Sequence, residues 1–166
     1  ELAFVREDLP KLLNSMMMGT KRIREIVLSL RNFSRLDESA VKTVDIHEGI
    51  DSTLVILNHR IKTDNCDQSI EIIKQYGELP LVDCYPSQLN QVLMNILSNA
   101  IDALASHPMP RITITTESQS GFAIIRIDDN GDGIPKEIQP QILNPFFTTK
   151  AVGKGTGMGM SISYQI

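Results

Sequence analysis

Hydrophobic residues recur every three or four positions between residues 8 and 37, which predicts one long amphipathic helix. The apolar stripe of this helix consists of Leu12, Leu13, Met16, Met17, Ile23, Ile26, Val27, Leu30 and Phe33. A lone helix cannot bury such a stripe, so it must pack either on its own domain or in a helical bundle. The chain supplies only one helix of such a bundle, and we therefore expect the partner helices to lie outside this sequence.

A polar stretch after this helix breaks the pattern and indicates a domain boundary. We expect the bundle helix to occupy residues 1–38, a linker to occupy residues 39–43, and a second domain to occupy residues 44–166. The two parts differ in pattern, because helical and strand periodicities interleave only after the linker.

The second domain has the pattern of an α+β fold. Helical spacing predicts helices over residues 47–61 and 87–105, and a third near 161–164. β-Branched or alternating residues predict strands near 44–46, 70–73, 81–84, 111–116 and 122–128. The last two strands form the clearest antiparallel pair, with its turn at Gly121. The expected class is α+β, with a mixed β-sheet covered on one face by helices.

Composition narrows the possible functions without choosing among them. The 16 basic and 20 acidic residues give a net charge of −4, without the basic excess typical of nucleic-acid binding. No apolar run approaches the ~20 residues that span a bilayer, so we expect this part of the protein to be cytoplasmic, although a longer parent could carry a membrane anchor. Cys66 and Cys84 form no CxxC motif and predict free thiols in a reducing compartment.

Three polar side chains share one face of the helix expected over residues 87–105. Asn95, Asn99 and Asp102 are spaced i, i+4 and i+7 in an otherwise apolar segment. Asparagine is a weak helix former, so two on one stripe require a reason. An amide oxygen is a good ligand for a hard cation, although the motif alone favours ordinary polar surface or a helix–helix contact.

A second motif, residues 128–135 (Asp-Asp-Asn-Gly-Asp-Gly-Ile-Pro), directly follows a strand. Its glycines permit a positive φ and the close approach of a ligand to the backbone. A carboxylate held there suits an exocyclic amine such as adenine N6. Taken alone, the motif favours an ordinary turn, because Asn-Gly and Asp-Gly are common turn formers. Calcium fits the alternating acids less well, because no glutamate stands at the closing position of an EF-hand.

The third motif, residues 153–160, has four glycines in seven residues and precedes a helix-compatible segment. Such a loop at a helix N-terminus can cradle phosphates. The spacing is not that of a P-loop. The strand that should precede a Rossmann loop is missing, because residues 144–150 (Asn-Pro-Phe-Phe-Thr-Thr-Lys) stand there.

Together with residues 144–150, these three motifs resemble the N, G1, F and G2 boxes of sensor histidine kinases in order and spacing. The likeness covers residues 85–164 by motif. Residues 8–37 are similar to the second helix of the family's dimerisation and phosphotransfer hairpin. The resemblance implies a Bergerat-type ATP-binding sandwich preceded by a long helix of a dimeric bundle.

The resemblance also implies roles for the matching residues, with ATP and Mg²⁺ as cofactors. Asn95 and Asn99 would be catalytic, and Asn99 would ligate the Mg²⁺ that bridges the phosphates. Asp129 would accept a hydrogen bond from adenine N6. The other residues expected at the nucleotide are Gly131, Gly133, Phe146, Phe147, Lys150, Lys154, Gly155, Thr156, Gly157, Met158 and Gly159.

Three features depart from the family pattern. Met158 and Met160 stand where leucine is usual, and their similar size should preserve function. Asp102 stands where many members have lysine or arginine, which argues against a phosphate contact from that position. The chain stops at Ile166, short of the final strand that the family usually adds, so we expect an incomplete sheet.

The implied activity is transfer of the ATP γ-phosphate to a histidine, for relay to the receiver domain of a response regulator. His47, followed by Glu48, superficially resembles the family's acceptor dipeptide, but it lies after the linker. We expect His47, His59 and His107 to be surface histidines and the acceptor to lie upstream of this sequence. This chain alone should therefore not phosphorylate itself, and the full protein should be a homodimer through the bundle.

Two other functions fit the same nucleotide fold. ATPase clamps of the gyrase and MutL type use a glutamate one turn before the magnesium asparagine to activate water. Here that position is Asn95, an amide that cannot act as a base, which favours phosphotransfer. A degenerate module that only binds ATP or dimerises is the second alternative, and the intact Asn99, Asp129 and lid glycines argue against it.

Overall fold

The computed structural model describes residues 9, 13, 16, 17, 20, 40–62, 69–150 and 157–166. The expected bundle helix lies almost entirely outside these residues, so that assignment stays a prediction, whereas residues 40–43 of the expected linker are described. Within the described residues, no helix is both long and apolar enough to cross a bilayer.

Helices and strands alternate along the described domain. In chain order the elements are β1 (Lys42–Val44), α2 (Ile46–Ile61), β2 (Glu71–Tyr76), β3 (Val82–Cys84), α3 (Pro86–Ala103), β4 (Arg111–Gln119), β5 (Phe122–Asp129), a 3-10 turn (Gln139–Gln141) and α4 (Gly159–Gln165). The main sheet has the order β2-β4-β5, with β2 parallel and β5 antiparallel to β4. β1 and β3 form a separate antiparallel pair. The α+β class with a mixed sheet is therefore confirmed.

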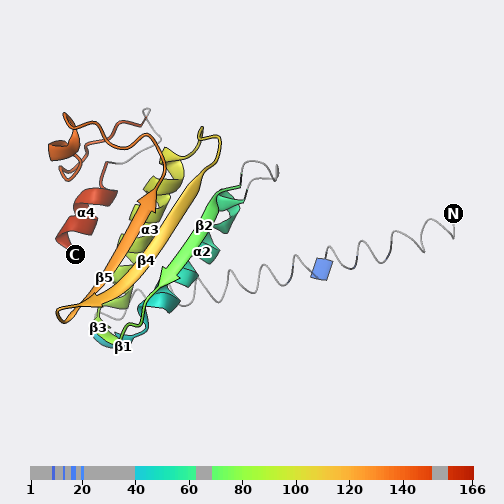
Figure 1. Cartoon of the computed structure of the whole chain (residues 1–166), viewed down its shortest axis with the longest axis vertical. Coiled ribbons are helices and arrows are strands. Elements are labelled where there is room, and N and C mark those ends of the chain that lie inside the picture. Colours follow the sequence, from blue (N-terminus) through green and yellow to red (C-terminus); the bar gives the residue numbers. More distant parts are fainter. Residues whose placement is uncertain are drawn as a thin grey trace.

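The two long helices lie against the same face of the sheet (Figure 1). Each carries one apolar stripe at helical spacing, and β4 alternates so that Ile112 and Ile114 point into the core. These side chains form one buried cluster, which consists of Ile46, Ile50, Leu54, Leu57, Ile61, Leu93, Leu97, Ala100, Ile101, Leu104, Ile112 and Ile114. The cluster fixes α3 on the sheet and so fixes the polar face that α3 presents beyond it.

A tight hairpin sets the register of β5 against β4. Its two turn residues, Ser120 and Gly121, have φ of 53° and 83°, the positive values that suit a two-residue hairpin loop. Gln119 therefore pairs with Phe122, and seven residues along each strand, Asp129 pairs with Ile112. The expected turn at Gly121 is confirmed, and it places Asp129 at the end of the sheet where β4 begins.

The element boundaries differ slightly from those expected. β1 begins at Lys42, inside the stretch assigned to the linker, because Lys42 pairs with Cys84 across the small sheet. β4 runs to Gln119, beyond its apolar alternation, because the hairpin keeps pairing to the turn. Pro86 begins α3 one residue earlier than expected, at a position where the missing N–H of proline costs no helical hydrogen bond.

Candidate functional site

The candidate site lies where α3 meets both α4 and the end of β5. Asn95, Asn99 and Asp102 lie along α3, and Asp129 ends β5. The segment around residues 130–150 continues from β5 beside the same end of the sheet (Figure 1). The three motifs therefore meet in one region, although they are separated in the sequence.

Asp129 is fixed by the turn that follows it. Its Oδ1 accepts a hydrogen bond from the Gly131 N–H at 3.0 Å, and the side chain remains exposed. A Cβ at Gly131 would lie 2.9 Å from that Oδ1 and 3.2 Å from the Ala103 carbonyl oxygen. A side chain there would displace the Asp129 carboxylate and crowd α3, so glycine keeps the carboxylate where the turn holds it. The two interpretations of this motif, a turn and a ligand site, are therefore compatible, because the turn holds the Asp129 carboxylate in position.

Asn130, which the sequence reasoning gave no role, fastens this turn to β4. Its Oδ1 accepts from the Arg111 N–H and its Nδ2 donates to the Met109 carbonyl, both at 2.8 Å. These bonds add to the backbone bond from the Asn130 N–H to the Arg111 carbonyl at 3.2 Å, and so continue the link between the two strands where β5 ends. An asparagine directly after a strand was the available signal, because its amide can mimic a backbone turn.

Asn99 and Asp102 are joined by charged side chains from two distant segments. The Lys150 ammonium donates to Asn99 Oδ1 at 3.0 Å and to Asp102 Oδ2 at 2.5 Å. Arg60 of α2 pairs with the other oxygen of Asp102, and its Nη1 donates to Ser98 Oγ at 2.5 Å. A cation therefore already lies on the amide oxygen of Asn99.

Asn95 contacts α4. Its Nδ2 donates to the Gly159 carbonyl oxygen at 3.0 Å and to Ser163 Oγ at 3.1 Å. Ser163 in turn donates to the same carbonyl at 2.9 Å. This amide joins the end of the glycine-rich loop to α3. Sequence reasoning did not find Ser163, which carries no signal beyond lying four residues after Gly159.

The backbones of Phe146 and Gly157 lie in close contact. Phe146 has φ +67° and is 73% exposed, and Gly157 has φ +65°. A Cβ at Gly157 would lie 2.3 Å from the Phe146 carbonyl carbon, so only glycine fits. Phe147 is half-buried beside this contact and Met158 is exposed.

The remaining expected residues lie elsewhere. Lys154, Gly155 and Thr156 lie outside the described residues, and Gly133 lies in the exposed loop with φ +73°.

A sequence model described as "Histidine kinase-, DNA gyrase B-, and HSP90-like ATPase" matches residues 84–166, half of the chain. The chain belongs to this ATPase family. The match begins at the end of β3 and includes every residue of the candidate site on α3, β5 and α4. Use of ATP by the family agrees with the exposed Asp129 carboxylate and the cation-binding face of α3.

Within this ATPase family, the chain is similar to sensor kinases. It is 35% identical over 145 residues to the signal transduction histidine-protein kinase AtoS of Escherichia coli K12. The aligned residues make up 87% of this chain and 23% of AtoS. The C4-dicarboxylate transport sensor protein DctB of Pseudomonas aeruginosa is 32% identical, over 86% of this chain and 23% of DctB. The chain thus spans about a quarter of the length of these relatives.

Solved structures agree with these relatives. The catalytic domain of histidine kinase ThkA, in a nucleotide-free form, matches with a TM-score of 0.64 and 29% identity, over 76% of this chain and 78% of that one. A second structure, of ThkA in complex with the response regulator protein TrrA, matches at 25% identity with a TM-score of 0.56, over 87% of this chain and 42% of that one. The resemblance to sensor histidine kinases is confirmed.

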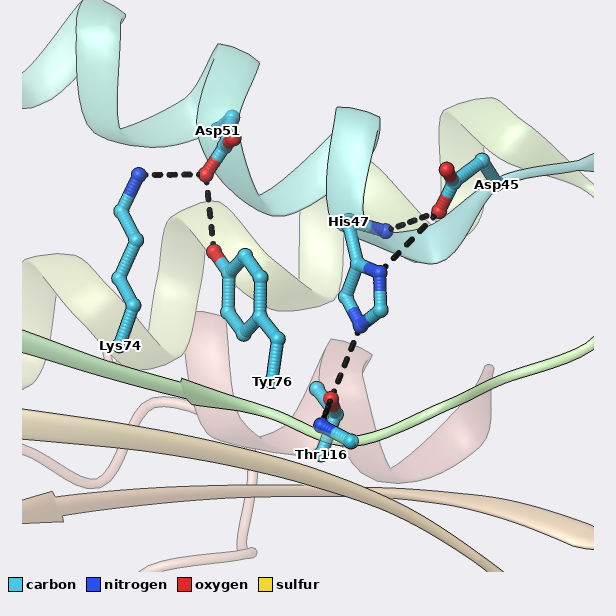
Figure 2. Close-up of polar contacts among 7 residues, drawn as sticks. Asp45, His47, Asp51, Lys74, Tyr76 and Thr116 are labelled. Atoms are coloured by element: carbon cyan, nitrogen blue, oxygen red, sulfur yellow. Dashed lines mark hydrogen bonds and ion pairs between the residues drawn. The ribbon is translucent and has the colours of Figure 1, made fainter.

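His47 lies away from this site, at the opposite end of the ATPase domain. Its Nε2 lies 2.9 Å from Thr116 Oγ1, and its Nδ1 lies 3.6 Å from Asp45 Oδ1 (Figure 2). The ring stacks on Tyr76 with a centroid distance of 4.3 Å. Both ring nitrogens therefore face protein oxygens, and the ring is half-buried instead of lying on the surface as expected. These contacts give His47 a structural role that joins α2 to β2 and β4.

The same network holds Tyr76 in its protonated form. The Tyr76 hydroxyl donates to Asp51 Oδ1 at 2.8 Å, and Lys74 donates to that oxygen at 2.6 Å (Figure 2). Burial, and then the hydrogen bond and negative charge of Asp51, raise the pKa of Tyr76 above its usual range. The hydroxyl therefore remains a donor throughout the physiological pH range.

Proposed function

We propose that this chain binds Mg²⁺-ATP as the catalytic part of a sensor histidine kinase. It transfers the γ-phosphate to a histidine upstream of this sequence, for relay to a response regulator. The observation that carries the proposal is the Lys150 ammonium on Asn99 Oδ1, on a face of α3 close to the exposed Asp129 carboxylate. The Asp129 end of the site suits the amine of adenine. The Asn99 end, where the Lys150 ammonium lies, suits the phosphates and their metal ion.

Adenine binds at the Asp129 end of the site. The carboxylate accepts a hydrogen bond from the exocyclic N6 amine, while the Gly131 N–H holds its Oδ1 in place. Gly133 keeps the loop open beside the base. Phe146 and Phe147 anchor the lid, and the phosphates contact Lys150, Lys154 and the loop of Gly155, Thr156, Gly157, Met158 and Gly159.

Magnesium binds at Asn99. The amide oxygen fits a cation, because it already accepts an ammonium at 3.0 Å. Mg²⁺ usually takes few protein ligands and completes its shell with phosphate oxygens and water, so one amide oxygen is sufficient. When bound, the ion neutralises charge that develops on the transferred phosphoryl group. Asn95 supports this site indirectly, since it ties α4 and the end of the phosphate loop to α3.

Phosphotransfer is favoured over ATP hydrolysis by the residue one turn before Asn99. Hydrolysis needs a base to activate water, whereas Asn95 is an amide that donates to α4. AtoS and ThkA are histidine kinases, DctB is a sensor protein, and one ThkA structure is a complex with the response regulator TrrA. By analogy, we infer a receiver-domain partner for this chain and a homodimer formed through residues 8–37.

Inosine nucleotides offer a direct test of the adenine assignment. Calorimetry with AMP-PNP and Mg²⁺ should show saturable binding to the chain, and the inosine triphosphate analogue should bind less well, because a 6-oxo group cannot donate to Asp129. Asp129→Ala should weaken AMP-PNP binding about tenfold to 100-fold, the effect of losing a hydrogen bond to a charged group, and should abolish the discrimination.

Asp132→Ala is the matched control, since Asp132 is an exposed acid in the same loop. It should change the affinity for AMP-PNP less than about twofold. If Asp129→Ala bound AMP-PNP normally, or kept its preference for adenine over inosine, the adenine assignment would be wrong.

A further inference from the structure

Asp102 holds two cations from two distant segments. It lies in the last turn of α3, where one carboxylate oxygen pairs with Arg60 of α2 and the other accepts from Lys150 at 2.5 Å. The three side chains are each about one-third exposed, at 30% for Arg60, 36% for Asp102 and 35% for Lys150. Arg60 also donates to Ser98, so the guanidinium bridges two residues of one face of α3 and fixes the Asp102 rotamer.

The Lys150 ammonium lies at the proposed metal ligand. It donates to Asn99 Oδ1 at 3.0 Å while it donates to Asp102 Oδ2. An ammonium has three donors, so two of them are used on α3. Mg²⁺ and this ammonium would repel each other on the same amide oxygen. With a metal on Asn99, the ammonium would keep the charged bond to Asp102 and have two donors free for phosphate oxygens.

We propose that Asp102 is a positioning residue that holds the Lys150 ammonium beside the phosphates of the bound nucleotide. The inference rests on the proposed function and adds a residue for which the sequence offered no role. A lysine side chain has a flexible stem of four carbons and loses much rotamer freedom when it is ordered. The ion pair with the Asp102 carboxylate already orders the Lys150 side chain, so nucleotide binding need not supply that loss of entropy.

The sign of the effect distinguishes this role from simple electrostatics. Asp102 is an anion beside a site for polyphosphate, so removal of its charge alone should tighten nucleotide binding. If Asp102 acts through Lys150, its removal should instead weaken binding, because the ammonium loses the partner that orients it. Replacement of Asp102 in a chain that already lacks Lys150 should then have little further effect.

A double-mutant cycle tests this. The affinity of the 166-residue chain for AMP-PNP with Mg²⁺ is measured by calorimetry for Asp102→Asn, Lys150→Met and the double variant. Each single variant should bind about tenfold more weakly, the effect of losing one charge-assisted hydrogen bond. The double variant should match Lys150→Met within about twofold. Matched controls are Asp51→Asn and Lys74→Met, which break a 2.6 Å ion pair of comparable exposure between α2 and β2 and should leave binding unchanged.

Each contrary result has a definite meaning. Tighter or unchanged binding by Asp102→Asn, or losses that multiply in the double variant, would overturn the positioning role. Tighter binding by Lys150→Met would show that the ammonium only competes with the metal, and would overturn it too. Absence of binding in the unsubstituted chain would overturn the proposed function and this inference together, whereas normal binding by all variants would overturn this inference alone.

Discussion

Asn99→Ala is expected to lower the affinity for Mg²⁺-ATP on the order of 100-fold, the upper range for disturbing a metal site. The variant removes the proposed metal ligand and also one of the two acceptors of Lys150. Because the lost interaction is with the metal, the effect should depend on it. Affinity for the nucleotide in the presence of EDTA should change far less than affinity with Mg²⁺.

Calorimetric titrations of AMP-PNP with and without Mg²⁺ measure this difference. Asn99→Asp keeps an oxygen ligand and should retain much of the metal dependence that Asn99→Ala loses. Gln88→Ala, an exposed amide in the first turns of α3, serves as the control and should bind normally. An equal loss of affinity with and without metal would place the Mg²⁺ elsewhere.

Leu97→Ala is expected to reduce the free energy of unfolding by about 3 kcal/mol, within the range of about 2–5 for buried leucine truncations. Leu97 is 0% exposed and lies in α3 at the centre of the core, between the sheet and the polar face that carries Asn95 and Asn99. The cavity left by three missing carbons cannot collapse easily, because the surrounding residues belong to the sheet and to both long helices.

Urea denaturation followed by circular dichroism measures this loss, with the slope compared to confirm that the denatured state is unaltered. Leu81→Ala is the control, because Leu81 is 65% exposed and its truncation should cost less than about 0.5 kcal/mol. A loss below about 1 kcal/mol for Leu97→Ala would contradict the described packing of α3 on the sheet.

The long periodic elements and the short strand β3 were predicted from the sequence, whereas the first two residues of β1 were not. α3 and the β4–β5 hairpin carry strong apolar periods and a glycine turn, so local pattern determines them. β1 has only three residues, and it is a strand because it pairs with β3 some forty residues later. Val44 marked a strand here, but no local pattern extends it to Lys42 and Thr43, which is why these two residues were assigned to the linker.

The candidate site was likewise predictable from local spacing but not in its tertiary contacts. Spacing alone placed Asn95, Asn99 and Asp102 on one face of a helix, but it could not identify their partners. Asp102 pairs with residues 42 and 48 positions away, and Asn95 reaches one 68 positions away. The sequence therefore revealed that α3 has a polar face, and only the tertiary contacts show which residues meet there.

Transfer of phosphate from radiolabelled ATP tests the central claim most directly. The chain is incubated with ATP and Mg²⁺, either alone or with a polypeptide that carries the histidine-bearing helix upstream of Glu1. We expect acid-labile label on the added polypeptide only, and none with the Asn99→Ala variant. The three histidines of this chain should stay unlabelled, since His47 is held against Thr116 and Tyr76 away from the site. Acid-labile phosphate on this chain alone would contradict an acceptor outside this sequence.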